Sequence, residues 1–271
     1  MKSTLRSLLV PFAKPLLSKI HRYKDAHKGE SCYLIGDGIS IKWFDLGAFS
    51  DKAAIPCGFI PFHNEFDRLK VNYLSLIEPW WFYPLQWTTS PPTKIIRNHI
   101  QRVYIDDVID RHPNKQFFVN LSNFATLRRK NITYNYQYFL DDALPNTHLS
   151  KRINAYEGSL RWMILLATYM GFDHVYLIGC DYTHINSRSL HWYEKGRGIC
   201  TKLPGYQEEF LKIAREFIDI TTITLDGSSE FINAVSYKEF TGRDPIFREN
   251  TELLSDKYLQ VLSTWPGYNV L

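Results

Sequence analysis

The stretch SCYLIGDGIS, residues 31–40, decides how the rest of the chain is interpreted. An apolar run ends at Gly36, and a second glycine, Gly38, follows two residues later. A short apolar run that stops at a glycine is typical of a buried strand leading into a tight turn. The turn is a Gly-x-Gly followed by Ser40, without the third glycine of a dinucleotide fingerprint. The sequence therefore predicts a strand-end turn able to line a ligand site, with Asp37 as its unusual residue.

The segments that follow alternate between strand-like and helix-like patterns. Strand-like runs occupy residues 53–62, 71–79, 115–123, 173–182 and 220–229, and helical periodicity occupies residues 157–171, 206–219 and 250–262. Strand–helix–strand alternation favours a mainly parallel sheet with helices on both faces. We therefore expect an α/β, Rossmann-like fold. In open sheets of this kind, ligands bind beyond the carboxyl ends of the strands.

Composition and charge narrow the classes of function. Hydrophobic residues make up 45% of the chain and charged residues 22%, which is typical of a globular protein. Residues 1–30 hold seven Lys or Arg against two acidic residues, an excess of +5, so the rest of the chain, at about −1, is close to neutral and no nucleic-acid partner is expected. The four cysteines show no zinc-ligand spacing, which favours reduced thiols. No apolar run reaches the roughly 18–20 residues that span a bilayer.

The first 28 residues form a basic segment with an apolar stripe. Between Leu5 and Ile20, leucines and other apolar residues recur at three- and four-residue steps. A basic amphipathic helix of this kind can bind an anionic membrane surface, but it can equally pack on the domain with its charges solvated. Both interpretations stay open. The first would place the protein in the cytoplasm, peripheral to the inner face of the membrane.

The stretch that follows the strand-like run at 173–182 carries most of the candidate catalytic groups. Its candidate side chains are Asp181, Tyr182, His184, His191 and Tyr193. Histidine is the usual general base near neutral pH, a carboxylate can orient it or bind a sugar, and a phenol can donate to a phosphate. The glycines of EKGRG, residues 194–198, indicate a mobile lid over about residues 182–206. Ordinary loop residues are the alternative interpretation of the same stretch.

Acidic pairs elsewhere in the chain offer a different chemistry. Asp106–Asp107 and Asp141–Asp142 are adjacent carboxylates, and Mg²⁺ prefers oxygen ligands. Neighbouring acids on a helix are more often solvated surface residues. We therefore predict no metal site and treat Mg²⁺ as non-essential.

The motifs stand in the order found in a known family. Three segments resemble, in sequence order, the motifs of the small bacterial sialyltransferases of glycosyltransferase family 42 and of related surface-polysaccharide proteins with a GNGPS-type turn. They are KDAHKGESCYLIGDGISI (24–41), EGSLRWMILLATYMGFDHVYLIGCDYT (157–183) and EEFLKIAREFIDITTITLDGSSEFINAV (208–235). The similarity spans Gly29 to Val235.

The resemblance implies a GT-A-like variant of the Rossmann-like fold with a lid. It also implies inverting transfer of an acidic sugar, sialic-acid-like or Kdo-like, from a CMP-activated donor to a glycan or glycolipid acceptor of the bacterial surface, in lipopolysaccharide or capsule biosynthesis, with no required cofactor. Self-association into a homo-oligomer would be compatible with this function.

The resemblance also implies roles for individual positions. Residues expected to line the nucleotide are Gly36, Asp37, Gly38, Ser40, Gly158, Ser159, Tyr182 and Tyr193. Candidate catalytic residues are His191, the preferred general base, together with His184 and Asp181. Candidate acceptor contacts are His63, Asn64 and Glu78. Backbone donors near Gly36 and the two tyrosines would stabilise the donor phosphate.

Two departures from the family pattern keep other functions open. The family has Asn and Pro where this chain has Asp37 and Ile39, and its histidine is missing from TKLPGY, residues 201–206. A pterin-diphosphokinase-like phosphotransferase, which would need ATP and Mg²⁺, shares the glycine turn. A non-catalytic scaffold of a glycan-assembly complex would explain the altered turn.

The sequence also predicts three parts of the chain. Residues 1–28 are the basic segment, residues 29–240 form the nucleotide-sugar-binding domain with its lid, and residues 241–271 are a helical tail.

Overall fold

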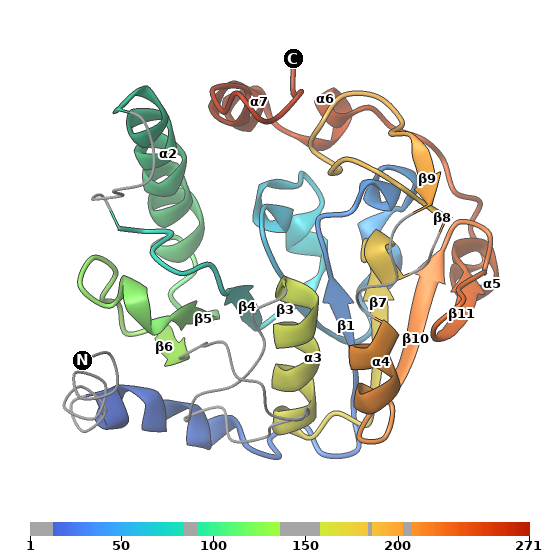
Figure 1. The fold of residues 1–271 in the computed structure, drawn as a ribbon, viewed down its shortest axis with the longest axis horizontal. Helices are drawn as coiled ribbons and strands as arrows, with labels where there is room; N and C mark the ends of the chain where they lie inside the picture. Colours follow the sequence, from blue (N-terminus) through green and yellow to red (C-terminus); the bar gives the residue numbers. More distant parts are fainter. Residues whose placement is uncertain (1–12, 84–90, 136–157, 184–185, 203–207) are drawn as a thin grey trace.

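The computed structural model describes residues 13–83, 91–135, 158–183, 186–202 and 208–271. Its centre is a six-stranded sheet in the order β11-β10-β7-β1-β2-β3, in which every neighbouring pair is parallel (Figure 1). The six strands are β1 (Ser31–Ile35), β2 (Ala53–Pro56), β3 (Lys70–Val71), β7 (His174–Ile178), β10 (Asp219–Thr224) and β11 (Asn233–Ser236). The predicted α/β fold with a mainly parallel sheet is confirmed.

A second, smaller sheet branches from the first at β2. It has the order β4-β5-β6, with strands β4 (Tyr73–Leu76), β5 (Gln116–Asn120) and β6 (Ile132–Asn135). The start of β2 pairs with β3, whereas Cys57, just after β2, forms a parallel bridge with Ser75 of β4. The carboxyl ends of β1, β2 and β4 are therefore neighbours at one edge of the molecule.

Helices and a hairpin surround the two sheets (Figure 1). The helices are α2 (Pro91–Tyr104), α3 (Ser159–Met170), α4 (Glu208–Ala214), α5 (Tyr237–Thr241), α6 (Asn250–Leu253) and α7 (Asp256–Ser263). Figure 1 shows α3 and α4 on one face of the main sheet, with α5 beyond β11. The antiparallel pair β8 (Asn186–Arg188) and β9 (Cys200–Lys202) falls within the predicted lid. We call residues 186–202 the lid hairpin.

Alternate residues of β1 point into two separate cores, as the two-residue period of a strand requires. Cys32 and Leu34 pack with apolar residues of α3 and α4, whereas Tyr33 and Ile35 pack on the opposite face. Helix α3 ends at Gly171, whose φ of +84° lets its N–H bond the carbonyls of the last turn. The predicted glycine stop of this helix is confirmed.

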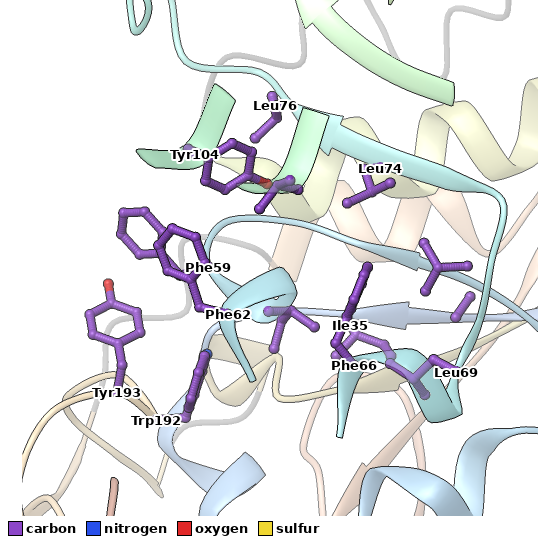
Figure 2. Packing of buried hydrophobic residues seen from close by; sticks show 14 of the residues in the cluster. Ile35, Phe59, Phe62, Phe66, Leu69, Leu74, Leu76, Tyr104, Trp192 and Tyr193 are labelled. Atoms are coloured by element: carbon purple, nitrogen blue, oxygen red, sulfur yellow. The ribbon is translucent and has the colours of Figure 1, made fainter. Parts of the chain in front are cut away.

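The opposite core is rich in aromatic side chains, and the lid hairpin contributes to it. Figure 2 shows Trp192 and Tyr193 of the hairpin beside Phe59 and Phe62, which follow β2. The Trp192 side chain is fully buried, and the ring of Tyr193 meets that of Phe59 edge-on at 5.3 Å. Trp192 and Tyr193 of the lid hairpin are therefore part of the folded core.

Other elements also differ from the predictions. The helix expected over 250–262 is two helices, because the Ser255 hydroxyl accepts from the N–H of Tyr258 and starts α7 anew. Helix α4 ends at Ala214, earlier than its periodicity suggested. Helix α2 and strands β6 and β11 were not predicted.

Only part of the basic N-terminal segment is described. Leu17 and Ile20 are buried in the two cores, while Lys14 and Lys19 are exposed. The described part of the apolar stripe therefore packs on the domain. The apolar residues from Leu5 to Phe12 lie outside the described residues. Among the described residues, no helix is long and apolar enough to cross a membrane.

Candidate active site

A cavity of about 520 Å³ opens at the carboxyl edge of the strands. Its wall comes from the turns after β1, β2 and β7, from the segment after β4, and from the first turn of α3. Helix α2, the lid hairpin and the segment after α7 complete it. This is the edge at which open α/β sheets bind ligands, so the cavity is the candidate active site.

The glycines of the first turn are required by a close approach between two chain segments. The N–H groups of Gly36 and Gly38 donate to the carbonyls of Ile178 (2.8 Å) and Gly179 (2.7 Å). A Cβ on Gly36 would lie 2.7 Å from the Gly179 oxygen, closer than such atoms approach. These two N–H groups are bonded within the protein, so they are not the phosphate donors that we expected near Gly36.

The carboxylate of Asp37 lies in the cavity wall but bonds to the protein itself. It accepts hydrogen bonds from the N–H of Phe59, at 3.0 and 3.2 Å to its two oxygens, and from the indole N–H of Trp192, at 3.1 Å. Burial raises the pKa of Asp37, while the facing His191 and these donors lower it. A Cβ on Gly58 would collide with this carboxylate. Asp37 thus joins the β1 turn, the β2 turn and the lid hairpin.

Asp181 and Ser40 bond to each other beside the cavity. The buried Asp181 carboxylate accepts the backbone N–H of Ser40 at 2.9 Å, which caps the short helix that follows the first turn. Among the described residues, the cavity wall includes neither of them. Asp181 therefore does not contact the cavity in the way that its place at the strand end suggested.

His191 lies in the cavity wall, and a carboxylate orients it. Its Nδ1 is 2.8 Å from Oε2 of Glu194, and the same oxygen accepts the backbone N–H of His191 at 2.8 Å. Glu194 is buried, whereas His191 is about one-third exposed. An imidazole that donates Nδ1–H to a carboxylate carries its lone pair on Nε2. In that tautomer, Nε2 of His191 could accept a proton.

Tyrosine rings pack around this histidine. The ring of Tyr193 stacks on His191 with centroids 4.9 Å apart and an angle of 7° between planes. Tyr268 meets both rings edge-on, 5.9 Å from His191 and 5.0 Å from Tyr193. Burial raises the pKa of Tyr193, and the charge of Asp37 and a hydrogen bond with Tyr268 raise it further, so its phenol remains protonated. Tyr193 and Tyr268 also line the cavity.

The far wall combines a helix start with two opposite charges. Gly158 and Ser159 begin α3 and line the cavity, as does Glu78 after β4. Burial raises the pKa of Glu78, the Asp37 charge raises it further, and Arg97 of α2 and a hydrogen bond with Ser159 lower it. The guanidinium of Arg97 lies over the ring of Trp81, 5.5 Å from its centroid. This wall therefore offers both a cation and a carboxyl group to a ligand.

Of the three predicted acceptor residues, the structure places one in the described cavity wall and two outside it. Glu78 lines the cavity, but His63 and Asn64 are outside the described wall. The buried His63 accepts the N–H of Glu65 on Nδ1 at 3.0 Å, and its ring lies 5.0 Å from that of Trp192. Asn64 donates to the Glu252 carbonyl at 3.1 Å. His63 therefore packs against the lid hairpin, whereas Asn64 contacts α6.

Two further candidates cannot be placed. His184 lies outside the described residues, and for Tyr182 only the backbone, in a short helix over Asp181–Thr183, is described. Asp141–Asp142 are also outside the described residues. Asp107 pairs with Lys257 and, at 3.2 Å, with Arg111. Within the described part of the chain, no group of three metal-ligating side chains is found.

Sequence reasoning missed several residues of this wall. Glu194 follows His191 by three residues, and this spacing was the one local signal that could have revealed the pair. Arg97, Trp265 and Tyr268 come from segments far from the recognised motifs. No spacing within the sequence brings them to the cavity, because only the tertiary fold does.

The chain was compared with protein families, curated proteins and solved structures, and only solved structures match it. No protein-family model and no curated protein matches the chain. Two solved structures of the sialyltransferase CstII from Campylobacter jejuni align with 87% of this chain and 99% of their own. The structure in complex with the substrate analogue cytidine-5'-monophosphate has 15% identity and a TM-score of 0.41. The structure in complex with CMP-3FNeuAc has 12% identity and a TM-score of 0.36.

Proposed function

We propose that this chain is a glycosyltransferase that uses His191 as its general base. The observation that carries the proposal is the His191–Glu194 pair in the wall of a cavity at the carboxyl ends of β1, β2, β4 and β7. A base held in one tautomer at a strand-end cavity suits proton removal from a bound hydroxyl group. The motif resemblance supplies the donor class, a CMP-activated sialic-acid-like or Kdo-like sugar.

The chemistry is a single inverting displacement. Nε2 of His191 removes the proton of an acceptor hydroxyl, whose oxygen attacks the anomeric carbon of the donor sugar. The bond between that carbon and the phosphate oxygen breaks, and CMP leaves with the electron pair. Tyr193, with its protonated phenol, and Arg97 are the described groups best suited to the negative charge that develops on the phosphate.

Nucleotide binding and turnover test the proposal separately. CMP should raise the thermal midpoint of the wild-type protein, because a ligand that binds only the folded state stabilises it. Stabilisation by ATP with Mg²⁺, and not by CMP, would favour a phosphotransferase. If no nucleotide stabilises the protein, a scaffold function gains support.

Turnover is measured as CMP release from CMP-sialic acid and CMP-Kdo with a surface-glycan acceptor. His191→Ala should lower kcat by about 10²–10⁴-fold, the usual contribution of a general base. His99→Ala, an exposed histidine of α2 outside the described cavity wall, is the matched control and should retain activity. If His191→Ala turns over at the wild-type rate, the base assignment is wrong.

We also propose that the basic segment attaches the protein to an anionic membrane surface. Lys14, Lys19, Lys24 and Lys28 are exposed, whereas Leu17 is buried in the domain. The described part would therefore contribute charge and little apolar insertion. Co-sedimentation with phosphatidylserine vesicles should weaken at high salt and on changing these lysines to glutamate. Binding that is indifferent to both changes would contradict this proposal.

A further inference from the structure

The segment after α7 runs along the lid hairpin and reaches the cavity. Trp265 and Tyr268 line the cavity, and Tyr268 packs edge-on against His191 and Tyr193. This segment lies outside the stretch that resembles known transferases, and the sequence suggested only a surface helix there. Its position therefore calls for a functional explanation.

Backbone groups of this segment hold the residues next to His191. The N–H of Asn269 donates to Oε1 of Glu194 at 3.3 Å, and the N–H of Lys195 donates to the carbonyl of Asn269 at 2.6 Å. Oε2 of Glu194 accepts a hydrogen bond from the backbone N–H of His191 and lies within hydrogen-bond distance of Nδ1 of the same residue. The two carboxylate oxygens are thus fixed from opposite sides. Rotation of the Glu194 carboxylate would break contacts to both segments.

A buried amide adds a second connection between the same two segments. Nδ2 of Asn250 donates to the carbonyl of Tyr193 at 3.0 Å and to the carbonyl of Val270 at 2.8 Å. Asn250 is 1% exposed, so these bonds form in the absence of competing solvent. Tyr193 is therefore fixed by a hydrogen bond to its backbone carbonyl as well as by the packing of its ring.

We propose that residues 265–270 are a positioning element for catalysis, which acts on His191 through Glu194. The segment fixes the carboxylate, the carboxylate fixes the tautomer and direction of the imidazole, and the lone pair of Nε2 is kept toward the cavity. This inference rests on the proposed function of His191 as a base. Orientation by a second group is a large part of the efficiency of such bases.

The first experiment uses Glu194→Gln, which keeps the shape of the side chain and removes its charge. The imidazole tautomer is read from ¹⁵N chemical shifts of His191 in the free protein, and kcat and the donor KM are measured with a CMP-sugar. We expect loss of the single Nδ1–H tautomer, a fall in kcat of about 10–100-fold, and a nearly unchanged KM. An unchanged tautomer and kcat would overturn the role of Glu194.

The second experiment tests the segment itself by removing one N–H group. Asn269→Pro cannot donate to Glu194, whereas Asn269→Ala still can. We expect Asn269→Pro to lose the Nδ1–H tautomer and to turn over about ten times more slowly than Asn269→Ala. Leu271→Ala, at a residue 64% exposed, should resemble the wild type. The inference is wrong if the proline and alanine variants show the same tautomer and the same kcat.

Proline also restricts the residue before it, Tyr268. Asn250→Ala is therefore a second variant, which removes the hydrogen bonds to the carbonyls of Tyr193 and Val270 without restricting the backbone. We expect it, too, to lose the Nδ1–H tautomer of His191 and to turn over more slowly. The tautomer measurement needs no substrate. If the wild-type protein transfers no sugar but Asn269→Pro still changes the tautomer, residues 265–270 do orient His191, whereas the proposed function and the catalytic role of this orientation are wrong.

Discussion

Trp192 donates twice to Asp37: its indole N–H lies 3.1 Å from Oδ1, and its backbone N–H lies 3.1 Å from the Asp37 carbonyl. These bonds join the lid hairpin to the turn after β1. They account for an acidic residue between two glycines, since its carboxylate is occupied by protein donors. Asp37 thus has a structural function in this chain, whichever ligand enters the cavity.

Asp37→Asn should stabilise the protein increasingly as pH rises. Burial raises the pKa of Asp37 in the folded state above its unfolded value, so ionisation costs stability in the wild type. The free energy of unfolding of the variant, minus that of the wild type, should therefore grow as pH increases from below about 4 to neutrality. Urea titrations across this range measure the difference.

The same variant should bind the CMP anion more tightly, because a carboxylate in the wall of the cavity has been removed. Asp37→Ala serves as the control for loss of the carboxylate's hydrogen bonds. It leaves the N–H donors of Phe59 and Trp192 unpaired, so its free energy of unfolding should fall by about 1–3 kcal/mol. Weaker binding by Asp37→Asn would show that the carboxylate itself contacts the nucleotide.

Arg97→Gln should weaken the binding of anionic nucleotides. Arg97 is a cation of the described cavity wall, and charged hydrogen bonds contribute about 1.5–3 kcal/mol, or roughly 10–100-fold in Kd. Isothermal titration with CMP measures the change. Arg102→Gln is matched in charge and helix, is exposed, and lies outside the described wall, so it should bind as the wild type does. Equal losses in both variants would point to a general effect of net charge.

His63→Gln should protect the protein against acid. Burial lowers the pKa of His63 to about 4, below its unfolded value of 6.5. The unfolded chain therefore binds a proton that the folded chain does not, and stability falls as pH drops from about 6.5 to 4, by about 3 kcal/mol in full. The variant should lose less stability over this range in denaturant titrations.

The histidine comparison requires a control for general acid effects. His99→Gln removes an exposed histidine of α2 and should follow the wild type through the same pH range. If His63→Gln and the wild type lose stability in parallel, His63 is not the residue that responds to acid.

Lys42→Met should loosen the lid hairpin. Nζ of the fully buried Lys42 donates to the Gly196 carbonyl at 2.7 Å and to Glu249 at 3.2 Å, and Glu249 also accepts the Gly196 N–H at 3.1 Å. Glu249 is partly exposed, so water can hydrate it once Lys42 is removed. We therefore expect the free energy of unfolding to fall by about 1–3 kcal/mol, which is less than breaking a fully buried ion pair would cost. Trypsin should then cleave the hairpin near Arg197 before global unfolding.

An exposed ion pair provides the comparison for this variant. Lys212 pairs with Glu208 one helical turn away on α4, and Lys212→Met should change stability by less than about 0.5 kcal/mol. Hairpin cleavage at the wild-type rate in Lys42→Met would mean that other contacts hold the hairpin closed.

The main sheet could be predicted because buried parallel strands are continuous apolar runs that end in turn residues. Strands β1 and β7 and helix α3 follow this rule. Strands β6 and β11, ITYN and NAVS, have no apolar run, and their neighbours in the sheet decide their conformation. The start of α2 at Pro91 was missed although proline is frequent in the first turn of a helix.

The strand-end turns of the candidate site could be predicted from local sequence, whereas His191, Tyr193, Gly158 and Ser159 were predicted from residue type and motif resemblance. Gly36, Asp37 and Gly38 follow β1, and a turn after a buried strand can be recognised from its neighbours in the sequence. Arg97 and Tyr268 stand in segments that match none of the recognised motifs. Their presence at the cavity depends on how those segments pack, which periodicity does not encode.

Because Trp265 and Tyr268 line the cavity, the main sheet can form during synthesis before the cavity is complete. Synthesis proceeds from the N-terminus, so β1, β2, β7 and β10 leave the ribosome well before these two aromatic residues. A nascent chain can therefore assemble its sheet while one side of the cavity is still open to solvent. Ligand binding should therefore appear only after residues 265–268 have been synthesised and packed against the lid hairpin.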